Sequence, residues 1–414
     1  MKANPSGDES AARQRSGPLA GVVVLDVTRV VAGPYCAMML ADLGATVIKV
    51  ENPNDPDYAR TFPPMVRNES QEESAFFAQY NRNKEGVSIN FRHEEGKRLF
   101  KRLARKAQVV LENFRPGTME RLGLGYEALQ AENPALVYAA ISGFGRTGPY
   151  SSRPAYDNSG QAAGGLWSMN GYPDRPPVRV GTIIGDLAAS LYAAIGILAA
   201  LREAEATGRG QVVDVSQQDS VLSLTENAVV RYTVDGDVAK PLGNDHPFVS
   251  PYGLFPCADG YVFFGGYTDK FWNLSCEIFG DEDAARDPRI DTMRKRFDPQ
   301  VSETIVKPLL NRWFSKHTKA ELESMVGDKV PLSAVKSIDE VVEDPHVNER
   351  GMIVKLPVAG VPTRMVGLPI KLSRLPEDAH RAAPGTGEHN REVLSRLLDL
   401  SEREVEALSR EGAI

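Results

Sequence analysis

The chain has 414 residues, a formal net charge of −7, 42% hydrophobic residues and 25% charged residues. These values are ordinary for a soluble globular protein, and the length predicts two or three domains. They exclude a chain that binds nucleic acid or a membrane through an overall excess of positive charge. We therefore expect neither as a partner.

Cysteine usage and the N-terminal residues indicate a cytoplasmic protein. Cys36, Cys257 and Cys276 are odd in number and widely spaced, which argues against a disulfide framework. Residues 1–17 are polar and lack the apolar core of a signal peptide, so they predict a disordered tail. The longest apolar helical run, residues 187–201, is shorter than the roughly 20 residues that span a bilayer. The histidines are scattered and CxxC and HExxH motifs are absent from the sequence, so no metal site is predicted.

The first half of the chain alternates apolar strands with helices. Residues 21–27 are a continuous apolar run, typical of a strand buried on both faces of a parallel sheet. Residues 32–44 predict a helix, because Pro34 suits a first turn and Gly44 suits a C-terminal stop. The alternation continues with strands at 45–51, 86–91, 108–113, 136–142 and 211–216, and with helices at 94–107, 126–133, from 186 onward and at 217–232. This order predicts an α/β fold with a Rossmann-like parallel sheet.

Composition changes along the chain predict a domain inserted within the large one. Residues 143–185 form a long glycine-rich stretch that we expect to be irregular and functional. After about Tyr232 turn-forming residues lead into a strand at 261–267 and several helices, which predict a smaller α+β domain. Short strands and a terminal helix pair follow. We expect a tail at 1–17, a large domain formed by 18–225 and 345–414, and a linker with the small domain at 226–344.

Nucleotide-binding motifs do not explain the first βαβ unit. The segment after the first strand reads DVTRVVAGPY and lacks the GxGxxG fingerprint of dinucleotide-binding folds. Glu51 ends the second strand, where such folds place a ribose-binding acid, but it stands without the glycines. We therefore predict no permanently bound cofactor.

A local excess of positive charge indicates a polyanionic ligand. Residues 82–106 hold nine Lys and Arg against three Glu, a local net charge of +6. A polyphosphate would need such a patch, whereas the basic face at 101–106 can equally be a solvated helix surface. Arg92, Asn113 and Arg115 follow strand ends, where open α/β sheets bind ligands.

Asp186 is the one carboxylate at the start of the apolar run 187–201, and it has two compatible interpretations. Aspartate is a favoured helix N-cap, because its side chain accepts hydrogen bonds from the first free N–H groups. A carboxylate kept ionised by the helix dipole beside apolar surface can also attack an activated acyl group. Gly185 would let a substrate approach the backbone closely.

The sequence resembles the class III coenzyme A transferases, the family of formyl-CoA transferase and carnitine-CoA transferase, to which α-methylacyl-CoA racemase is related. The matching segments begin with LAGVVVLDVTRVVAGPYCAMMLADLG and YNRNKEGVSIN. They continue through ENFRPGTMERLGLGYEAL, SGFGRTGPYSSRPAYDNSGQAAGG, IGDLAASLYAAIGILAAL and GEHNREVL, in order over nearly the whole chain.

The resemblance implies transfer of CoA from an acyl-CoA donor to a carboxylate acceptor. In the family an aspartate in a Gly-Asp pair attacks the thioester, forming an aspartyl anhydride and then an aspartyl-CoA thioester. The matching residue here is Asp186. The resemblance places Val30, Ala32, Ile89, Phe91, Arg92, Asn113, Phe114 and Arg121 along bound CoA. Arg92 and Arg121 would pair with phosphates, and Ile89 and Phe91 would offer apolar faces.

Two segments depart from formyl-CoA transferase. Val31 stands where that enzyme has glutamine, and residues 243–253, GNDHPFVSPYG, replace a glycine-rich loop. The specificity for oxalate and formyl-CoA is therefore not carried over. His246 lies in this segment, where it either contacts a substrate carboxylate or has a structural role. Arg29, Arg153, Arg175 and Arg179 are candidates for a second carboxylate of a small dicarboxylic acceptor.

One position separates transferases from racemases within the resemblance. Racemases place a histidine before an aspartate thirty residues upstream of the shared aspartate, where this chain has Tyr156 before Asp157. A phenol is a poor base near neutral pH, because its ordinary pKa is about 10. Tyr156 is expected to bond the aspartyl intermediate or substrate, or to be a buried aromatic with a satisfied hydroxyl. We predict a transferase; racemization and non-catalytic CoA binding are the alternatives. The resemblance also implies a homodimer of two interlocked open rings.

Overall fold

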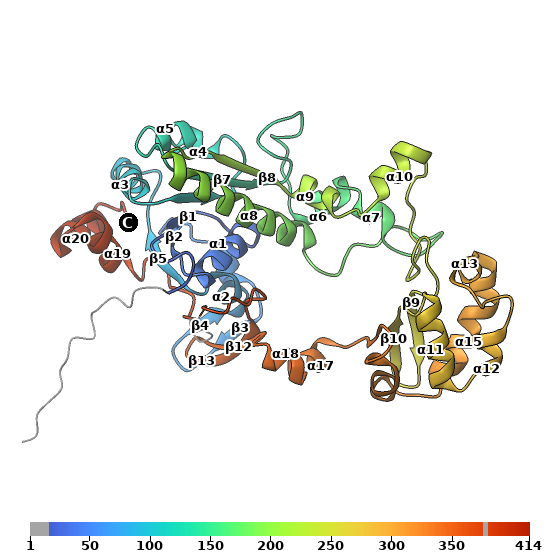
Figure 1. Ribbon diagram of the computed structural model, residues 1–414. Coiled ribbons are helices and arrows are strands. Elements are labelled where there is room, and N and C mark those ends of the chain that lie inside the picture. The colour runs from blue at the N-terminus through green and yellow to red at the C-terminus, as the bar shows by residue number, and fades with distance from the viewer. Residues whose placement is uncertain (1–15, 376–379) are drawn as a thin grey trace, which may run out of the picture. The chain divides into compact units, whose positions relative to one another are not determined.

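The computed structural model describes residues 16–375 and 380–414, which form two compact units (Figure 1). The first unit contains residues up to Leu166, Val180–Asn227 and His346–Ile414. The second contains Trp167–Arg179 and Ala228–Pro345. Of the tail expected over residues 1–17, residues 1–15 lie outside the described chain. The segment Trp167–Arg179 belongs to the second unit, although it lies within the stretch 18–225 that we expected in the large domain.

The first unit is built on a parallel sheet of six strands in the order β5-β2-β1-β6-β7-β8. Its strands are β1 (Val23–Asp26), β2 (Thr46–Glu51), β5 (Lys84–Ser88), β6 (Val109–Glu112), β7 (Val137–Ser142) and β8 (Val212–Ser216). The chain enters at β1, runs outward through β2 and β5, and crosses back to β6 on the other side of β1. The order thus reverses between β1 and β6, where open α/β sheets hold ligands. The predicted α/β fold with a parallel sheet is confirmed.

Helices cover both faces of this sheet (Figure 1). One face packs against α3 (Glu94–Ala104), α4 (Thr118–Arg121), α5 (Tyr126–Gln130), α19 (Asn390–Leu398) and α20 (Glu402–Arg410). The other face packs against α1 (Ala32–Asp42) and α8 (Ile184–Thr207). Small residues on these two helices, including Ala37 and Ala193, are completely buried. The helices therefore lie close to the strands, and the first turn of each is held firmly near the sheet.

Two antiparallel hairpins and short helices complete the first unit. The hairpins pair β3 (Met65–Arg67) with β4 (Glu72–Ser74) and β12 (Ile353–Val358) with β13 (Val361–Val366). The helices are α2 (Ala75–Asn81), α6 (Asp157–Ala163), α9 (Gln217–Ser223), α18 (Pro345–Glu349), of which Pro345 belongs to the second unit, and the 3-10 turn Tyr58–Thr61. The aromatic rings of Phe62 and Phe76 pack edge to face and link this turn to α2.

The second unit has a three-stranded antiparallel sheet in the order β11-β10-β9. The strands are β9 (Gly253–Cys257), β10 (Gly260–Phe264) and β11 (Leu332–Ala334). The helices that belong to it are α10 (Ala228–Asp235), α11 (Asp269–Phe279), α12 (Glu282–Arg286), α13 (Met293–Arg296), α14 (Pro299–Val301), α15 (Lys307–Phe314), α16 (Lys319–Leu322) and α17 (Ile338–Glu343), with π-helical segments at Ser302–Val306 and Glu323–Gly327. Trp272 and Phe314 are buried at its centre.

Two local expectations need correction. Residues 143–185 are irregular over most of their length, as expected, but they also contain α6 and the short helix α7 (Leu166–Met169). The glycines that suggested a loop instead allow α6 to pack closely on α9, because a Cβ at Gly160 would lie 2.6 Å from Gln217 Cβ. The single helix expected at 217–232 is broken into α9 and α10, because Glu226 between them adopts a left-handed backbone with φ of 52°.

Helix α8 is longer than the apolar run that we recognised in the sequence. It spans 24 residues and is long and apolar enough to cross a membrane by length and composition. A core helix of a soluble protein passes the same test, and Ala189, Ala193 and Ile197 of α8 are buried in the core against the sheet.

Two buried ion pairs fix the loop that follows β1. Lys84 Nζ lies 2.8 Å from Asp26 Oδ2, and Lys49 Nζ lies 3.0 Å from Asp57 Oδ2, with all four side chains buried. Asp57 also accepts a hydrogen bond from the backbone N–H of Val30, whose φ of 68° is unusual for a β-branched residue. Burial raises the pKa of Asp26, but the charges of Lys84 and Lys49 outweigh it and hold that pKa below its ordinary value. Buried charge therefore helps to hold the loop, in addition to the apolar packing of Val27 and Val31.

Replacement of Lys84 by methionine tests this role. Lys84→Met leaves the Asp26 carboxylate buried without its closest cation, which we expect to reduce the free energy of unfolding by about 3–5 kcal/mol at pH 7. Chemical denaturation followed by circular dichroism measures the change. Lys97→Met is the matched control, because Lys97 pairs with the exposed Glu94 and its loss should cost less than about 1 kcal/mol. Equal losses for the two variants would contradict the assignment.

Candidate active site

Asp186 lies in the first turn of α8, but it is not the residue that caps this helix. The helix begins at Ile184, and Asp186 makes no side-chain hydrogen bond to the N–H groups of the first turn. The carboxylate of Asp157 takes that role, because its Oδ1 accepts hydrogen bonds from the N–H of Gly185 at 2.8 Å and of Asp186 at 3.1 Å. The N-cap interpretation of Asp186 is therefore wrong, and its carboxylate is free for another role.

Three helix beginnings meet around Asp186. Asp157 is the first residue of α6, Asp186 lies in the first turn of α8, and Gln217 is the first residue of α9. Gln217 Nε2 donates a hydrogen bond to Asp186 Oδ1. Glycines permit this convergence, because a Cβ at Gly185 would lie 3.0 Å from the backbone oxygen of Asp157. The glycines of this region thus bring side chains together instead of adding flexibility.

The environment of Asp186 makes its carboxyl group unusually basic. Burial and the nearby charge of Asp157 raise the pKa of Asp186 to about 7, and the hydrogen bond from Gln217 opposes them. These effects outweigh the helix dipole, which we expected to keep the group fully ionised. Near neutral pH a large fraction is ionised, and a carboxylate of higher basicity is a stronger nucleophile. This combination suits covalent attack on a carbonyl group.

Tyr156 directly precedes α6 and is mostly exposed, with 77% of its surface accessible. The interpretation of Tyr156 as a buried aromatic is therefore wrong for the single chain. Its backbone N–H donates to Ser159 Oγ at 3.3 Å, and its phenol lies near Tyr58, whose pKa is raised by burial and by the neighbouring Tyr156. Asp157, the next residue, contacts the first turn of α8. Tyr156 is thus one residue from the group that positions the helix of Asp186.

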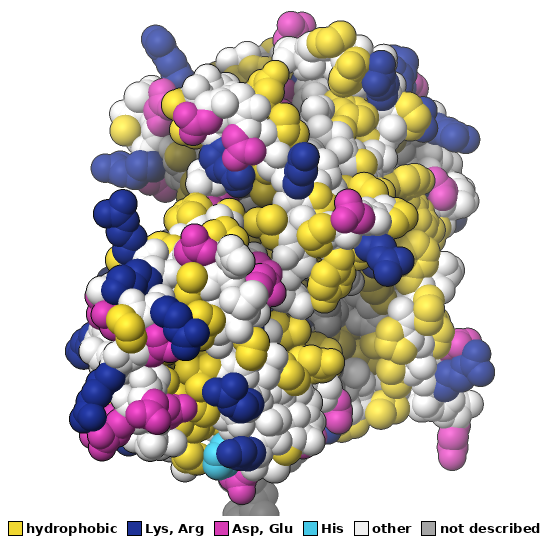
Figure 2. Space-filling view, turned by 90° about the vertical axis from the view of Figure 1, so that its right-hand side faces the viewer, with side chains coloured by type: hydrophobic (Ala, Val, Ile, Leu, Met, Phe, Trp, Pro, Cys, Tyr) yellow, Lys and Arg dark blue, Asp and Glu magenta, His cyan; other side chains and the backbone are white. Residues whose placement is uncertain are grey.

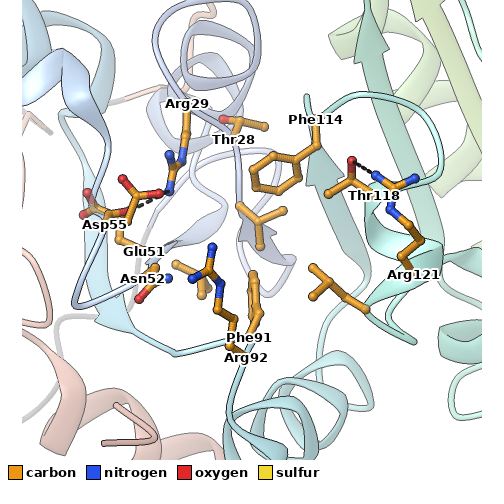
Figure 3. Close-up of a pocket in the computed structure, with 13 residues that line it drawn as sticks. Thr28, Arg29, Glu51, Asn52, Asp55, Phe91, Arg92, Phe114, Thr118 and Arg121 are labelled. Atoms are coloured by element: carbon orange, nitrogen blue, oxygen red, sulfur yellow. Dashed lines mark hydrogen bonds and ion pairs between the residues drawn. The ribbon is translucent and has the colours of Figure 1, made fainter. Parts of the chain in front are cut away.

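A cavity of about 320 Å³ opens at the carboxyl ends of β1, β2 and β6 (Figure 3). Four predicted CoA-binding residues line it, namely Phe91, Arg92, Phe114 and Arg121. Figure 3 shows the ring of Phe114 and the guanidinium group of Arg92 projecting into the space between the strand ends. In the described chain neither arginine forms an ion pair, and Arg121 donates to Thr118 Oγ1 at 2.9 Å. The cavity thus offers two cations and two aromatic rings.

The other four predicted CoA-binding residues do not line this cavity. Ile89 is buried in the core below it. Asn113 fixes the loop after β1, since its Nδ2 donates to the carbonyl oxygen of Arg29 at 2.8 Å. Val30 is held in the same loop by Asp57. Ala32 begins α1, and its carbonyl oxygen accepts a hydrogen bond from Ser190 Oγ at 2.6 Å.

The contact of Ala32 with Ser190 links the cavity to Asp186. Ser190 lies one turn after Asp186 on α8, and its hydroxyl also contacts the backbone oxygen of Asp186 at 2.7 Å. The loop between β1 and α1 contributes Thr28 and Arg29 to the cavity and leads directly into Ala32. A ligand that follows this loop from the cavity would therefore reach the first turn of α8.

Much of the positive charge at residues 82–106 is not available to a ligand. Arg82 is buried against Asp42, and Lys84 is buried against Asp26. Arg105 pairs with Glu132 on the surface. Of the expected basic patch, Arg92 lines the cavity, whereas buried carboxylates neutralise Arg82 and Lys84.

Other sequence candidates are engaged in contacts of their own. Glu51 accepts hydrogen bonds from Arg60, so it is paired and not a free ribose ligand. Arg29 forms an ion pair with Asp55 at 3.0 Å on the cavity wall. Arg153 stacks on the ring of Tyr150 at 3.6 Å.

His246 lies in the second unit. Its ring packs edge to face on Phe248, with centroids 4.5 Å apart, and on Tyr252, with centroids 5.2 Å apart. His246 Nδ1 accepts a hydrogen bond from the N–H of Phe248 at 3.4 Å. Arg175 and Arg179 are exposed on the same unit.

Sequence reasoning missed Gln217 and the capping role of Asp157. Both are first residues of helices, Asp157 of α6 after a loop and Gln217 of α9 directly after β8. The sequence signal for Gln217 is weak. VSQQDS is an ordinary helix start in which Ser216 is the cap, and the pattern does not distinguish Gln217 from its neighbours.

Comparisons with known proteins identify relatives of this chain. The family model described as CoA-transferase family III matches residues 19–390. Succinyl-CoA–D-citramalate CoA-transferase of Chloroflexus aurantiacus is 36% identical, over 96% of this chain and 98% of that protein. Succinyl-CoA:mesaconate CoA-transferase of Haloarcula marismortui is 36% identical, over 91% of this chain and 96% of that protein. A crystal structure of a CaiB/BaiF family protein from Brucella suis aligns with a TM-score of 0.81 at 34% identity, covering 92% of this chain and all of that chain. These matches confirm the resemblance seen in the sequence.

The titration of Asp186 tests the electrostatics of the site. We expect the carboxyl ¹³C resonance of Asp186 to titrate near pH 7, and Asp157→Asn to lower this midpoint because it removes the neighbouring charge. The Asp186→Asn variant assigns the resonance. Since the ordinary pKa is 3.8, the folded protein binds this proton more tightly than the unfolded chain, and the stability that this group contributes falls as the pH rises from about 4 to about 7. Titration near pH 4 would contradict the burial argument.

Proposed function

Because the chain belongs to CoA-transferase family III, we propose that it transfers CoA from an acyl-CoA donor to a small carboxylic acid through covalent intermediates on Asp186. The observation that carries the proposal is the carboxylate of Asp186. It is relieved of capping by Asp157 and held by Gln217, and its pKa is raised to about 7. Such a group is nucleophilic and partly ionised at neutral pH.

The bonds that form and break in the reaction involve only the Asp186 carboxylate and the two substrates. An oxygen of Asp186 attacks the thioester carbonyl of the donor, the C–S bond breaks, and CoA thiolate leaves a mixed anhydride. The thiolate attacks Cγ of Asp186, which releases the donor acid and leaves an aspartyl-CoA thioester. The acceptor carboxylate then attacks Cγ and releases the thiolate, which attacks the acceptor acyl carbon. This last step forms the new acyl-CoA and regenerates Asp186.

The cavity between the strand ends is the proposed site for the nucleotide part of CoA. Arg92 and Arg121 would pair with phosphates, and Phe91 and Phe114 would pack on the adenine and on apolar parts of the ligand. The pantetheine arm would follow the loop through Val30 and Asn113 to Ala32, which Ser190 links to α8. This path carries the thioester from the cavity toward Asp186. Ile89 would act indirectly, because it is buried below the cavity floor.

We propose a small dicarboxylic acid as the acceptor. Relatives that are 36% identical are named for succinyl-CoA with D-citramalate or mesaconate. In the described chain the groups that act on the pKa of Asp186 are Asp157 and Gln217, with no cation among them. A second carboxylate of the acceptor therefore needs a cation from elsewhere. Arg29 and Arg153, which belong to the same unit as Asp186, are the candidates.

Racemization is the alternative reaction for this family relationship. It requires a second base opposite Asp186, and the chain has Tyr156 where racemases have histidine. The exposed phenol of Tyr156, which lies near Tyr58, instead suits a hydrogen bond to the acyl group of a substrate. Non-catalytic CoA binding would not require a basic nucleophile at the end of the path.

We also propose a homodimer, in which two open-ring chains interlock as the resemblance implies. Support comes from Leu191, Ile195 and Leu198, which follow helical spacing on α8 and are exposed in the single chain, and from the exposed Leu222 of α9. Apolar surfaces of this kind mark protein interfaces. Figure 2 shows hydrophobic side chains gathered in patches between charged ones on one face of the molecule. The cytoplasmic location stays a prediction.

The covalent step is tested by intact-protein mass spectrometry after acid quench. Wild type mixed with succinyl-CoA should gain the mass of CoA less one water, because the aspartyl thioester retains CoA while one Asp186 oxygen leaves with the donor acid. Asp186→Ala should show no adduct and should lose turnover by at least about 10³-fold, since the nucleophile is absent. Retained CoA binding in a titration controls for folding. An adduct in the variant would overturn the assignment of Asp186. Exchange of the α-proton of 2-methylacyl-CoA in heavy water, without an adduct, would favour racemization.

The nucleotide site is tested by Arg92→Ala. A hydrogen bond to a charged group contributes about 1.5–3 kcal/mol, so KM for the acyl-CoA should rise roughly 10- to 100-fold while kcat stays within about threefold. Steady-state kinetics with varied donor measure both constants. Arg105→Ala is the matched control, because Arg105 pairs with Glu132 outside the cavity and should leave KM unchanged. An unchanged KM for Arg92→Ala would remove Arg92 from the CoA site.

A further inference from the structure

Gln217 is the one hydrogen-bonding side chain that the described structure places on the Asp186 carboxylate. Its Nε2 donates to Oδ1 of Asp186. In the described residues no hydrogen bond reaches Oδ2, so the two carboxylate oxygens are not equivalent. Oδ2 is the oxygen free to attack a substrate, and Oδ1 is the oxygen that a donor already holds.

This asymmetry persists through the reaction. If Oδ2 attacks the thioester, it becomes the bridging oxygen of the anhydride, and Oδ1 becomes the carbonyl oxygen of the aspartyl group. When a nucleophile then adds to Cγ, negative charge develops on Oδ1. A donor already placed at that oxygen stabilises the charge without reorganising at the moment of reaction.

The other end of the same amide has no partner. Gln217 is 7% exposed, and its Oε1 is buried with no hydrogen bond in the described structure. A buried acceptor without a donor destabilises a folded protein. The close approach of Gly160 to Gln217 Cβ leaves the side chain little freedom to turn away. The chain therefore keeps this amide at a cost in stability, which is typical of a group retained for function.

We propose that Gln217 is a catalytic residue that stabilises the oxyanion on Oδ1 of Asp186 when CoA thiolate attacks the anhydride and when the acceptor attacks the aspartyl-CoA thioester. The inference rests on the proposed function. Neither step changes Gln217, which donates the same N–H throughout and takes up no proton or electron pair.

The test compares Gln217→Met with wild type. Methionine keeps the length of the side chain but removes both the donor and the unpartnered oxygen. We expect kcat to fall roughly 10²- to 10³-fold, as for loss of an oxyanion donor. The CoA adduct of the quenched-mass assay should form slower by a similar factor. The melting temperature should stay unchanged or rise, which a merely structural role would not produce.

A second variant and a matched control keep the test decisive. Gln217→Glu has nearly the same shape but no donor when ionised, so at pH 8 it should lose at least as much activity as Gln217→Met. Gln218→Met makes the same chemical change one residue further along α9, where the amide donates to the carbonyl oxygen of Ala163, and should keep kcat within about threefold.

The outcomes separate this inference from the proposed function. An adduct in wild type, with kcat and adduct formation unchanged in both Gln217 variants, overturns the role of Gln217 alone. A fall in kcat matched by a fall in melting temperature, and by an equal loss in Gln218→Met, also overturns it. Absence of an adduct in wild type with every donor tried overturns both. The pH profile adds a further readout, because loss of the Gln217 hydrogen bond should raise the acidic midpoint of kcat/KM.

Discussion

The site depends on one contact, the carboxylate of Asp157 at the beginning of α8. The first N–H groups of any helix lack partners, and an aspartate in the first turn would ordinarily bond to them. Asp157 takes the N–H groups of Gly185 and Asp186, so the side chain of Asp186 does not have to fold back on its own helix. A second consequence follows from the same contact. The charge of Asp157 lies close enough to raise the pKa of Asp186, so one interaction both frees the carboxylate and makes it more basic.

The cavity is organised by charge in a comparable way. The loop after β1 carries Val30 in a left-handed conformation, and Asp57 holds its N–H while Lys49 balances the buried charge of Asp57. Buried ion pairs contribute little net stability compared with apolar packing, but they specify geometry. The loop leads into Ala32, which Ser190 joins to α8. Strain and buried charge are thus concentrated between the cavity and the carboxylate, where a ligand would pass.

The sequence predicts the sheet well because its strands are continuous apolar runs bounded by turn signals. Residues 21–27 and 136–142 lie on β1 and β7, and the motif at Gly185 and Asp186 lies at the beginning of α8 as expected. What the sequence could not provide is which side chain pairs with each buried charge. In the sequence, Arg82 and Lys84 belong to a basic patch. In the core, Asp42 neutralises Arg82 and Asp26 neutralises Lys84, and Asp26 lies more than fifty residues before Lys84 in the chain.

The glycines show more clearly that a local sequence pattern does not reveal contacts with distant segments. A pattern rich in glycine predicts a loop when only local freedom is considered. Gly160 and Gly164 instead lie on or at the end of α6, where a side chain would collide with Gln217 or Val221 of α9. Their role depends on a helix that lies about sixty residues later in the chain, so no local rule could reveal it.

The balance of effects on the pKa of Asp186 explains why the site combines two carboxylates with an amide, and not a carboxylate with a cation. A lysine or arginine beside Asp186 would lower its pKa and weaken it as a nucleophile. A neutral amide donor bonds the ionised oxygen and, unlike a cation, adds no net charge to the site. In the proposed reaction it would therefore bind the carboxylate before attack and the neutral aspartyl carbonyl afterwards without a change in its own state. Burial and Asp157 raise the basicity of Asp186, the Gln217 amide limits that rise, and the result is a group with a pKa of about 7. In the proposed reaction a cation would stabilise the resting carboxylate most strongly, whereas the amide would stabilise the charge that forms on Oδ1 during each attack on Cγ.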